Sequence, residues 1–197
     1  MKITGIAILL FFYAVYLGKM LLQKRKGIQT DQMAKGEEKD GVFYTEMILK
    51  IATYAVVVVE VVSVFTVSPG LPGWAVLLGA FLGLAGDAVF ATAVVTMKDS
   101  WRAGVAEKDK TEMVTGGIYR ISRNPAFLGF DCVYAGLLLM FFNLPLLLFS
   151  VFAMTMLHLQ IIQEERYLQG AFGEDYVAYK NRVYRYLGRR SRKHYER

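Results

Sequence analysis

The sequence predicts an all-α polytopic membrane protein with five transmembrane helices. Hydrophobic residues make up 55% of its 197 residues, and they occur in long blocks rather than at the spacing of a surface helix. Basic residues gather between these blocks. A helix needs about 20 mostly apolar residues to cross about 30 Å of hydrocarbon. Blocks of this length are therefore typical of membrane spans and exclude an ordinary soluble domain.

Five blocks are long enough to cross a bilayer. The first has no small-residue cleavage site after its apolar run and is followed by basic residues, which indicates a retained span rather than a signal peptide. We expect one integral membrane domain over residues 1–197, with spans at residues 3–22, 47–67, 71–97, 126–142 and 144–162.

The positions of lysine and arginine predict the orientation, because cytoplasmic loops carry the excess of both. Five lie in residues 23–42, six in residues 98–124 and nine from Arg166 onward, whereas the turns "SPGLPG" and "NLP" contain none. This pattern places the N-terminus outside and the C-terminus in the cytoplasm. The formal net charge of +6 suits an anionic lipid surface. Nucleic acid is not an expected partner, since most of the chain is embedded in lipid.

Small and acidic residues interrupt the spans. Gly79, Gly83 and Gly86 lie on one face of the third span, where they would allow close packing of a second helix. Acidic groups inside a membrane are costly and often functional. Pairing and helix packing compete with catalysis as explanations for the acidic residues inside the spans, which are Glu60, Asp87 and Asp131.

The last two spans are separated only by "NLP", which predicts a tight antiparallel hairpin. Its two open ends, near Asn124 and near Glu164, would then lie side by side on the cytoplasmic face. Pro125 suits the first turn of a helix, and Asn124 suits the capping position before it. Such a helix start offers free amide donors to a ligand. Because neighbouring residues on a helix diverge by about 100°, only one of Glu164 and Glu165 can point squarely into a pocket there.

An amphipathic helix is expected after the hairpin. Apolar side chains recur at helical spacing from Phe172 to Tyr186, with arginine and lysine on the rest of the wheel. This pattern favours a helix at the membrane interface. The basic residues that follow predict a lipid-bound or frayed end.

Two stretches carry a family resemblance. The string "EMVTGGIYRISRNPAFLG", a hydrophobic hairpin, and then "EERYLQGAFGEDYVAYKNRV" resemble the C-terminal signature of the isoprenylcysteine carboxyl methyltransferase family and its phospholipid methyltransferase relatives. The resemblance covers about residues 113–183. It implies an integral membrane enzyme that binds S-adenosylmethionine in a cytosol-facing pocket, releases S-adenosylhomocysteine, and takes a lipophilic small-molecule or prenylated acceptor from the bilayer.

The resemblance also implies site residues. Residues 98–125 and 163–187 would form the cytoplasmic cofactor-binding region, with Glu164 or Glu165 as the catalytic candidates. The implied cofactor-binding residues are Glu112, Met113, Val114, Tyr119, Asn124, Pro125, Ala126, Phe127 and Glu164.

The chain departs from the family pattern at two places. Most relatives have histidine where this chain has Asn124, which keeps a donor and an acceptor but does not titrate near neutrality. Where an arginine is expected to hold the acceptor carboxylate, this chain has His158, Gln160 and Gln163. With asparagine in place of histidine, Asn124 can still bind a cofactor but cannot act as a general base near neutral pH. Without the expected arginine, the identity of the acceptor stays open.

Carboxyl O-methylation of an isoprenylcysteine-like acceptor is the leading functional hypothesis. A carboxylate is already ionised at pH 7 and needs no base, whereas an amine or thiol acceptor would need Glu164 or Glu165 to remove a proton. The alternatives are a phospholipid, amine or thiol methyltransferase, a nicotinamide-dependent membrane reductase, and a non-catalytic membrane scaffold. No metal ion is expected, and the oligomeric state is not predicted.

Overall fold

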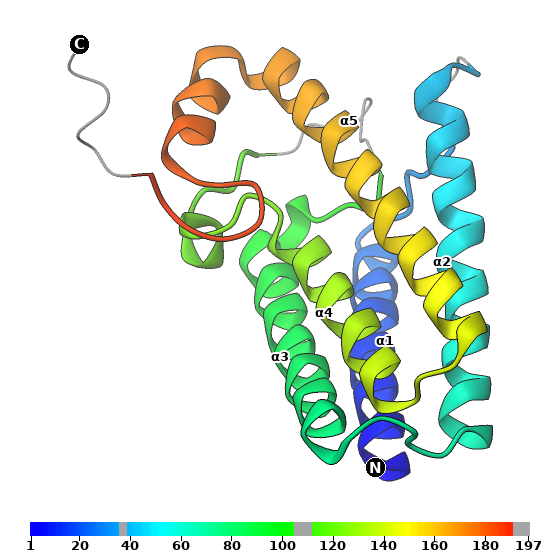
Figure 1. Ribbon diagram of the computed structural model, residues 1–197. Helices are drawn as coiled ribbons and strands as arrows, with labels where there is room; N and C mark the ends of the chain where they lie inside the picture. Colours follow the sequence, from blue (N-terminus) through cyan, green and yellow to red (C-terminus); the bar gives the residue numbers. More distant parts are fainter. Residues whose placement is uncertain (36–38, 105–111, 191–197) are drawn as a thin grey trace.

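A computed structural model describes residues 1–35, 39–104 and 112–190 (Figure 1). In these ranges the chain is helical, with no β-structure beyond two isolated bridges. Parts of the predicted cytoplasmic region (residues 105–111) and of the basic end (residues 191–197) lie outside the described residues. The helices are α1 (Lys2–Arg25), α2 (Gly41–Thr66), α3 (Gly73–Met97), the short 3-10 helices η1 (Lys98–Ser100) and η2 (Gly117–Arg120), α4 (Pro125–Met140) and α5 (Leu144–Arg182).

Four of these helices, α1, α2, α3 and α5, are long and apolar enough to cross a membrane. At a rise of 1.5 Å per residue, the 16 residues of α4 extend about 24 Å, which is short of the ~30 Å hydrocarbon core. The protein is therefore a polytopic membrane protein, and a fifth span at α4 stays a prediction. The five long helices alternate in direction through the bundle (Figure 1).

Helix α5 is much longer than the predicted span. The part before its bend, residues 144–172, extends about 43 Å, well beyond the hydrocarbon thickness. Its apolar part ends at Ile162, so the charged half that follows lies outside the hydrocarbon. The expected interfacial helix is the end of α5 itself, which bends at Gly173 (φ 51°, ψ −129°) and stops at Arg182 rather than reaching Tyr186.

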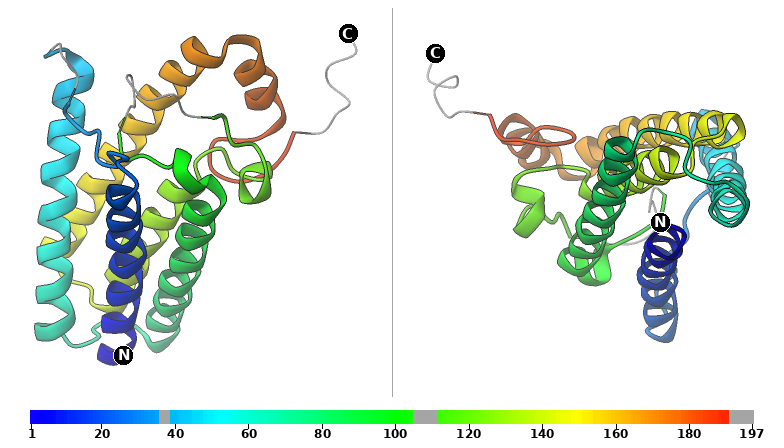
Figure 2. Two further views of the ribbon diagram at one scale, coloured as in Figure 1. Left: turned by 180° about the vertical axis from the view of Figure 1, so that it is seen from behind. Right: turned by 60° about the horizontal axis from the view of Figure 1, so that its bottom comes forward.

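Helices α3 and α4 form the closest pair in the bundle. A Cβ added to Gly136 would lie 2.6 Å from the carbonyl oxygen of Gly79, and one added to Gly86 would lie 2.8 Å from that of Gly129. The predicted close packing of the third span is thus confirmed, with α4 as its neighbour. Helix α5 packs more extensively against α2 than against α4, and its first half lies beside α2 in both views of Figure 2. A tight pairing of α4 with α5 is therefore not confirmed.

We expect Gly136→Ala to lower the melting temperature of the detergent-solubilised protein. The added methyl group would separate two helix backbones, and overpacking of this kind costs about 1–3 kcal/mol. The matched control is Gly18→Ala in α1, where a Cβ meets nothing within 4 Å. The control should be neutral or slightly stabilising because alanine is the better helix former. Equal melting temperatures for the two variants would contradict the tight contact.

Candidate active site

The start of α4 has proline in its first turn and Asn124 at the capping position, as the sequence predicts. The prediction that the Asn124 side chain caps this helix is wrong, however, because that side chain accepts no hydrogen bond from the first amides of α4. Its amide instead donates to Glu165 Oε1 (3.1 Å) and to the carbonyl of Arg185 (3.2 Å). The amides of Ala126 and Phe127 consequently have neither an intrahelical partner nor a side-chain cap. The helix start therefore keeps the anion-binding character of free N–H groups.

Glu165 joins three segments that are far apart in the sequence. Arg123 donates to its carboxylate at 2.7 Å and Arg185 at 2.9 Å, and the Glu165 side chain is 5% exposed. Burial alone would raise the pKa of this carboxyl, but hydrogen bonds from Arg185 and Arg123 outweigh burial and hold the pKa below its ordinary value. Glu165 is thus an ionised structural centre in α5 that connects this helix to the start of α4 and to the C-terminal loop.

Glu164 points elsewhere, as the helical geometry requires. It accepts a hydrogen bond from Gln160 (3.2 Å), whose amide also donates to Glu46 (3.1 Å). Burial raises the pKa of Glu164 to about 7, the hydrogen bond from Gln160 opposes the rise, and the nearby Glu46 carboxyl adds to it. The adjacent glutamates therefore differ: Glu165 is fixed in its charged form, whereas Glu164 can change its charge near neutral pH.

A cavity that we call the carboxylate cavity opens between the start of α4, the segment before η2 and the outer half of α5. It contains about 720 Å³ of empty space including its mouth, a size typical of small-molecule sites. Neither Pro125 nor Glu165 lines it. The structure does bring together the other eight residues of the implied cofactor set, which are Glu112, Met113, Val114, Tyr119, Asn124, Ala126, Phe127 and Glu164.

Three aromatic residues around the bend of α5 lie within the expected cofactor-binding region but were not among the residues implied for the cofactor. Phe172, Tyr176 and Tyr179 line the carboxylate cavity, and the Tyr179 hydroxyl donates to the carbonyl of Tyr119 at 2.7 Å. In the sequence, these side chains formed the apolar face assigned to the membrane surface. An apolar face with this periodicity can lie on a membrane or line a cavity. Only the bend at Gly173 shows that the face with Phe172, Tyr176 and Tyr179 turns toward the cavity.

We expect Gly173→Ala to weaken ligand binding in the carboxylate cavity. The backbone at Gly173 has a positive φ that costs other residues about 1–3 kcal/mol, so alanine would straighten the bend and withdraw Tyr176 and Tyr179. Gly170→Ala is the matched control, because Gly170 is three residues away, has no positive φ and has open space around it. If the cavity holds the cofactor that the sequence resemblance implies, isothermal titration with S-adenosylhomocysteine should show weaker binding for the first variant alone. Unchanged binding in both would argue against the bend as a positioning device.

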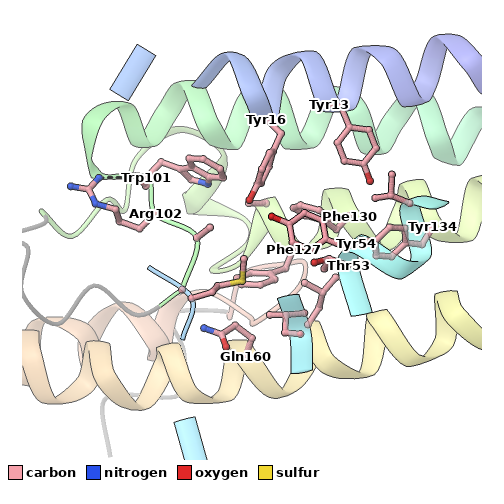
Figure 3. Close-up of a pocket in the computed structure, with 17 residues that line it drawn as sticks. Tyr13, Tyr16, Thr53, Tyr54, Trp101, Arg102, Phe127, Phe130, Tyr134 and Gln160 are labelled. Atoms are coloured by element: carbon pink, nitrogen blue, oxygen red, sulfur yellow. Dashed lines mark hydrogen bonds between the residues drawn. The ribbon is translucent and has the colours of Figure 1, made fainter. Parts of the chain in front are cut away.

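A second cavity, which we call the apolar cavity, lies between α1, α2, α4 and α5 and contains about 780 Å³ of empty space (Figure 3). Aromatic and aliphatic side chains dominate its lining. Trp101 and Arg102 lie at one end of it, and Tyr13 and Tyr134 lie at the other (Figure 3). The two cavities share a wall formed by Trp101, Arg102, Ala126 and Phe127. A ligand in one would therefore lie next to a ligand in the other at the start of α4.

Comparison with known protein families assigns the chain to a family. Residues 74–175, from the start of α3 to just past the bend of α5, match the family model described as phospholipid methyltransferase. The chain belongs to the phospholipid methyltransferase family. The matched region contains both glutamates, Asn124 and the shared wall between the cavities.

A curated relative agrees with this assignment. The chain is 29% identical over 131 residues to "Protein-S-isoprenylcysteine O-methyltransferase B" of Arabidopsis thaliana. The match covers 64% of this chain and 66% of the relative, just under two thirds of that protein's length. Together with the apolar helices, membership of the phospholipid methyltransferase family supports a membrane methyltransferase.

Proposed function

We propose that the protein transfers a methyl group from S-adenosylmethionine to the carboxylate of an isoprenylcysteine-like lipid. The observation that carries this proposal is the shared wall: a cavity lined by carboxylates and aromatic rings adjoins an apolar cavity that lies between the long apolar helices. Reactions between a water-soluble donor and a lipid acceptor need two such sites in contact. The name of the curated relative favours the same acceptor class.

The residues of the carboxylate cavity fit the cofactor. Its adenine can pack on rings such as those of Phe172 and Tyr176, and its hydroxyl and ammonium groups are donors suited to Glu112 and Glu164. The free amides of Ala126 and Phe127 suit its carboxylate. We propose these roles for the implied cofactor residues. Pro125 would act indirectly, by starting the helix without an N–H of its own.

When bound, the cofactor supplies an electrophilic methyl group on a positively charged sulfur. The transfer forms a bond from an acceptor carboxylate oxygen to the methyl carbon, while the bond from carbon to sulfur breaks and its electron pair stays on sulfur. No proton moves, so the chain needs no base for this acceptor. Its residues would align the two ligands across the wall and exclude water, a contribution worth about 7–11 kcal/mol in well-oriented reactions.

Amine methylation is the second candidate, and one observation favours it specifically. Glu164 lines the carboxylate cavity and has a pKa raised by burial to about 7, which is suitable for a general base. The description of the matching family also refers to phospholipids. Glu165, by contrast, is enclosed by Arg123, Arg185 and Asn124, so we assign it a positioning role.

The proposed orientation places the carboxylate cavity in the cytoplasm. Residue 1 lies at the opposite end of the bundle from the C-terminal loop (Figure 1), and the basic residues gather in the loops at the cavity end. The N-terminus would then lie outside. Cysteine labelling at the two ends in intact cells would test this arrangement.

The function is tested with methyl-labelled S-adenosylmethionine and a panel of S-prenylcysteine and phospholipid acceptors. We expect label in the prenylcysteine product, released as methanol by mild alkali because the product is an ester. Label that resists alkali and stays with an amine-bearing lipid would favour the second candidate. Absence of label from every acceptor, in a sample that binds S-adenosylhomocysteine, would exclude both acceptor classes.

A further inference from the structure

One buried amide group holds two carboxyl groups that come from different helices. Gln160 of α5 is 1% exposed, and its side-chain nitrogen donates to Glu164 Oε1 at 3.2 Å and to Glu46 Oε1 at 3.1 Å. Glu164 lies one turn further along α5, whereas Glu46 belongs to α2 and is 3% exposed. An amide nitrogen has two hydrogens, so the two carboxyls use it fully. Gln160 thus connects Glu164, which lines the carboxylate cavity, to a carboxyl outside the cavity lining.

Packing alone does not explain this arrangement. Among the described residues, the buried amide oxygen of Gln160 has no hydrogen-bond partner. A buried polar atom without a partner costs stability, and methionine would fill a similar space without that cost. The second carboxyl adds to the cost, because like charges in a buried site repel each other. The contacts that Gln160 and Glu46 make with Glu164 and with each other therefore require a further explanation.

Glu46 also has a structural contact, which defines the competing explanation. Its second oxygen accepts from the backbone amide of Ala34 at 2.8 Å, so Glu46 helps to hold the segment before α2 against that helix. An ion pair makes the same connection one turn along α2, where Lys50 donates to Asp31 at 2.6 Å. Removing either contact would loosen the segment, but of the two acidic residues it is Glu46 that shares a donor with Glu164.

The two partners of Glu164 act on its charge in opposite directions. Burial raises the pKa of Glu164 to about 7, the hydrogen bond from Gln160 opposes the rise, and repulsion from the Glu46 carboxyl adds to it. The other charged or titratable groups that line the cavity are Glu112, Tyr119, Arg102, Arg123, Tyr176 and Tyr179. Burial raises the pKa of each of these tyrosines, so they stay protonated near neutral pH, and the arginines stay charged. Glu112 is exposed, where solvent screens its charge.

We propose that Glu46 and Gln160 are positioning residues for Glu164: the Gln160 amide holds the Glu164 carboxyl at the carboxylate cavity, and the Glu46 carboxyl, held by the same amide, controls its charge. The proposal rests on the proposed function for the assignment of the cofactor to this cavity. Discrimination between the charged S-adenosylmethionine and its neutral product then depends on a residue of α2 outside the cavity lining. The network would thereby favour exchange of the product for a new methyl donor.

The pH dependence of the cofactor preference tests this role. The full chain in detergent would be titrated with S-adenosylmethionine and with S-adenosylhomocysteine from pH 6 to pH 8, and the ratio of the two Kd values followed. Glu46→Gln removes a negative charge, so Glu164 should ionise at lower pH. Gln160→Met removes a donor to the ionised form, so Glu164 should ionise at higher pH. At pH 7 we expect the ratio to move about twofold toward S-adenosylmethionine in the first variant and about twofold toward S-adenosylhomocysteine in the second.

Asp31→Asn is the matched control. It weakens the ion pair that fastens the segment before α2, but Asp31 is not one of the groups that shift the pKa of Glu164. The pH midpoint of the ratio should therefore stay at its parent value. A melting-temperature rise with S-adenosylhomocysteine would confirm that each variant is folded. Should Glu46→Gln or Gln160→Met fail to fold, the other decides the result, because the two expected shifts have opposite signs.

Infrared spectroscopy of the unliganded protein separates this proposal from the proposed function. The carboxylic-acid band that is lost in Glu164→Gln reports protonation of Glu164 directly, and its pH midpoint should fall in Glu46→Gln and rise in Gln160→Met. These shifts in a protein that binds neither ligand would overturn the proposed function but support the control of Glu164 by its two partners. Ligand binding with unmoved midpoints in both variants, or an equal shift in Asp31→Asn, would overturn the positioning role and leave the proposed function intact.

Discussion

Glu165→Gln is expected to destabilise the protein by about 3 kcal/mol, because it leaves the buried guanidinium of Arg123 without its counter-ion. The amide that replaces the carboxylate also cannot accept from Arg123, Arg185 and Asn124 together. The start of α4, the part of α5 around residue 165 and the C-terminal loop would separate, and the carboxylate cavity would lose its shape. We therefore expect loss of S-adenosylhomocysteine binding together with a lower melting temperature.

The control for this change is Asp99→Asn. Asp99 also pairs with a cation, Lys26 at 2.7 Å, but both partners of that pair are more than half exposed. An exposed pair contributes little, so the melting temperature and ligand binding should stay near those of the parent protein. A second comparison is Glu164→Gln, which should keep the fold because, within the described residues, the side chain of Glu164 is held by the neutral Gln160 rather than by a cation. Similar melting temperatures for Glu165→Gln and Glu164→Gln would refute the structural role of Glu165.

The sequence was sufficient to predict an all-helical membrane protein and the residues that surround the carboxylate cavity. Hydrophobic blocks locate helices because lipid imposes length and composition on each span. Pro125 located the start of α4 because proline suits only the first turn. The ordered strings around Asn124 and Glu164 identified residues that the structure brings around one cavity.

Side-chain partners at the site could not be predicted in the same way. Asn124 is a good capping residue locally, but Glu165, 41 residues away, takes its amide instead. Choosing between Glu164 and Glu165 requires the rotation of α5 about its axis, which its packing on α2 determines. Tyr176 and Tyr179 gave a membrane-surface pattern because an inward-facing stripe and a lipid-facing stripe have the same period. Tertiary contacts decided each of these cases.

Glu164 gives a pH-dependent prediction for the preference between the two forms of the proposed cofactor. S-adenosylmethionine and S-adenosylhomocysteine share every group except the methyl and the positive charge on sulfur. With the pKa of Glu164 raised by burial to about 7, its carboxyl is largely neutral at pH 6 and largely ionised at pH 8. A carboxylate in the cavity stabilises the charged sulfur and has little effect on the neutral one. The Kd ratio should therefore shift about tenfold toward S-adenosylmethionine between these pH values, equivalent to about 1.4 kcal/mol.

Glu164→Gln should abolish this shift and leave the preference near its pH 6 value. Titration calorimetry with both ligands measures the ratio, in which protonation of their shared amino group cancels. The pH dependence of the unliganded protein's stability is a second, independent test of the raised pKa of Glu164. A carboxyl whose pKa is raised on folding stabilises the protein most below its ordinary pKa of 4.5, and that stabilisation is lost as pH rises through about 7. Melting temperature should accordingly fall between pH 5 and pH 8 more steeply in the parent protein than in Glu164→Gln. A steeper fall combined with a pH-independent ligand ratio would mean that the Glu164 carboxyl lies beside the cavity without facing the sulfur. Amine methylation would then lose its candidate for the proton-accepting residue.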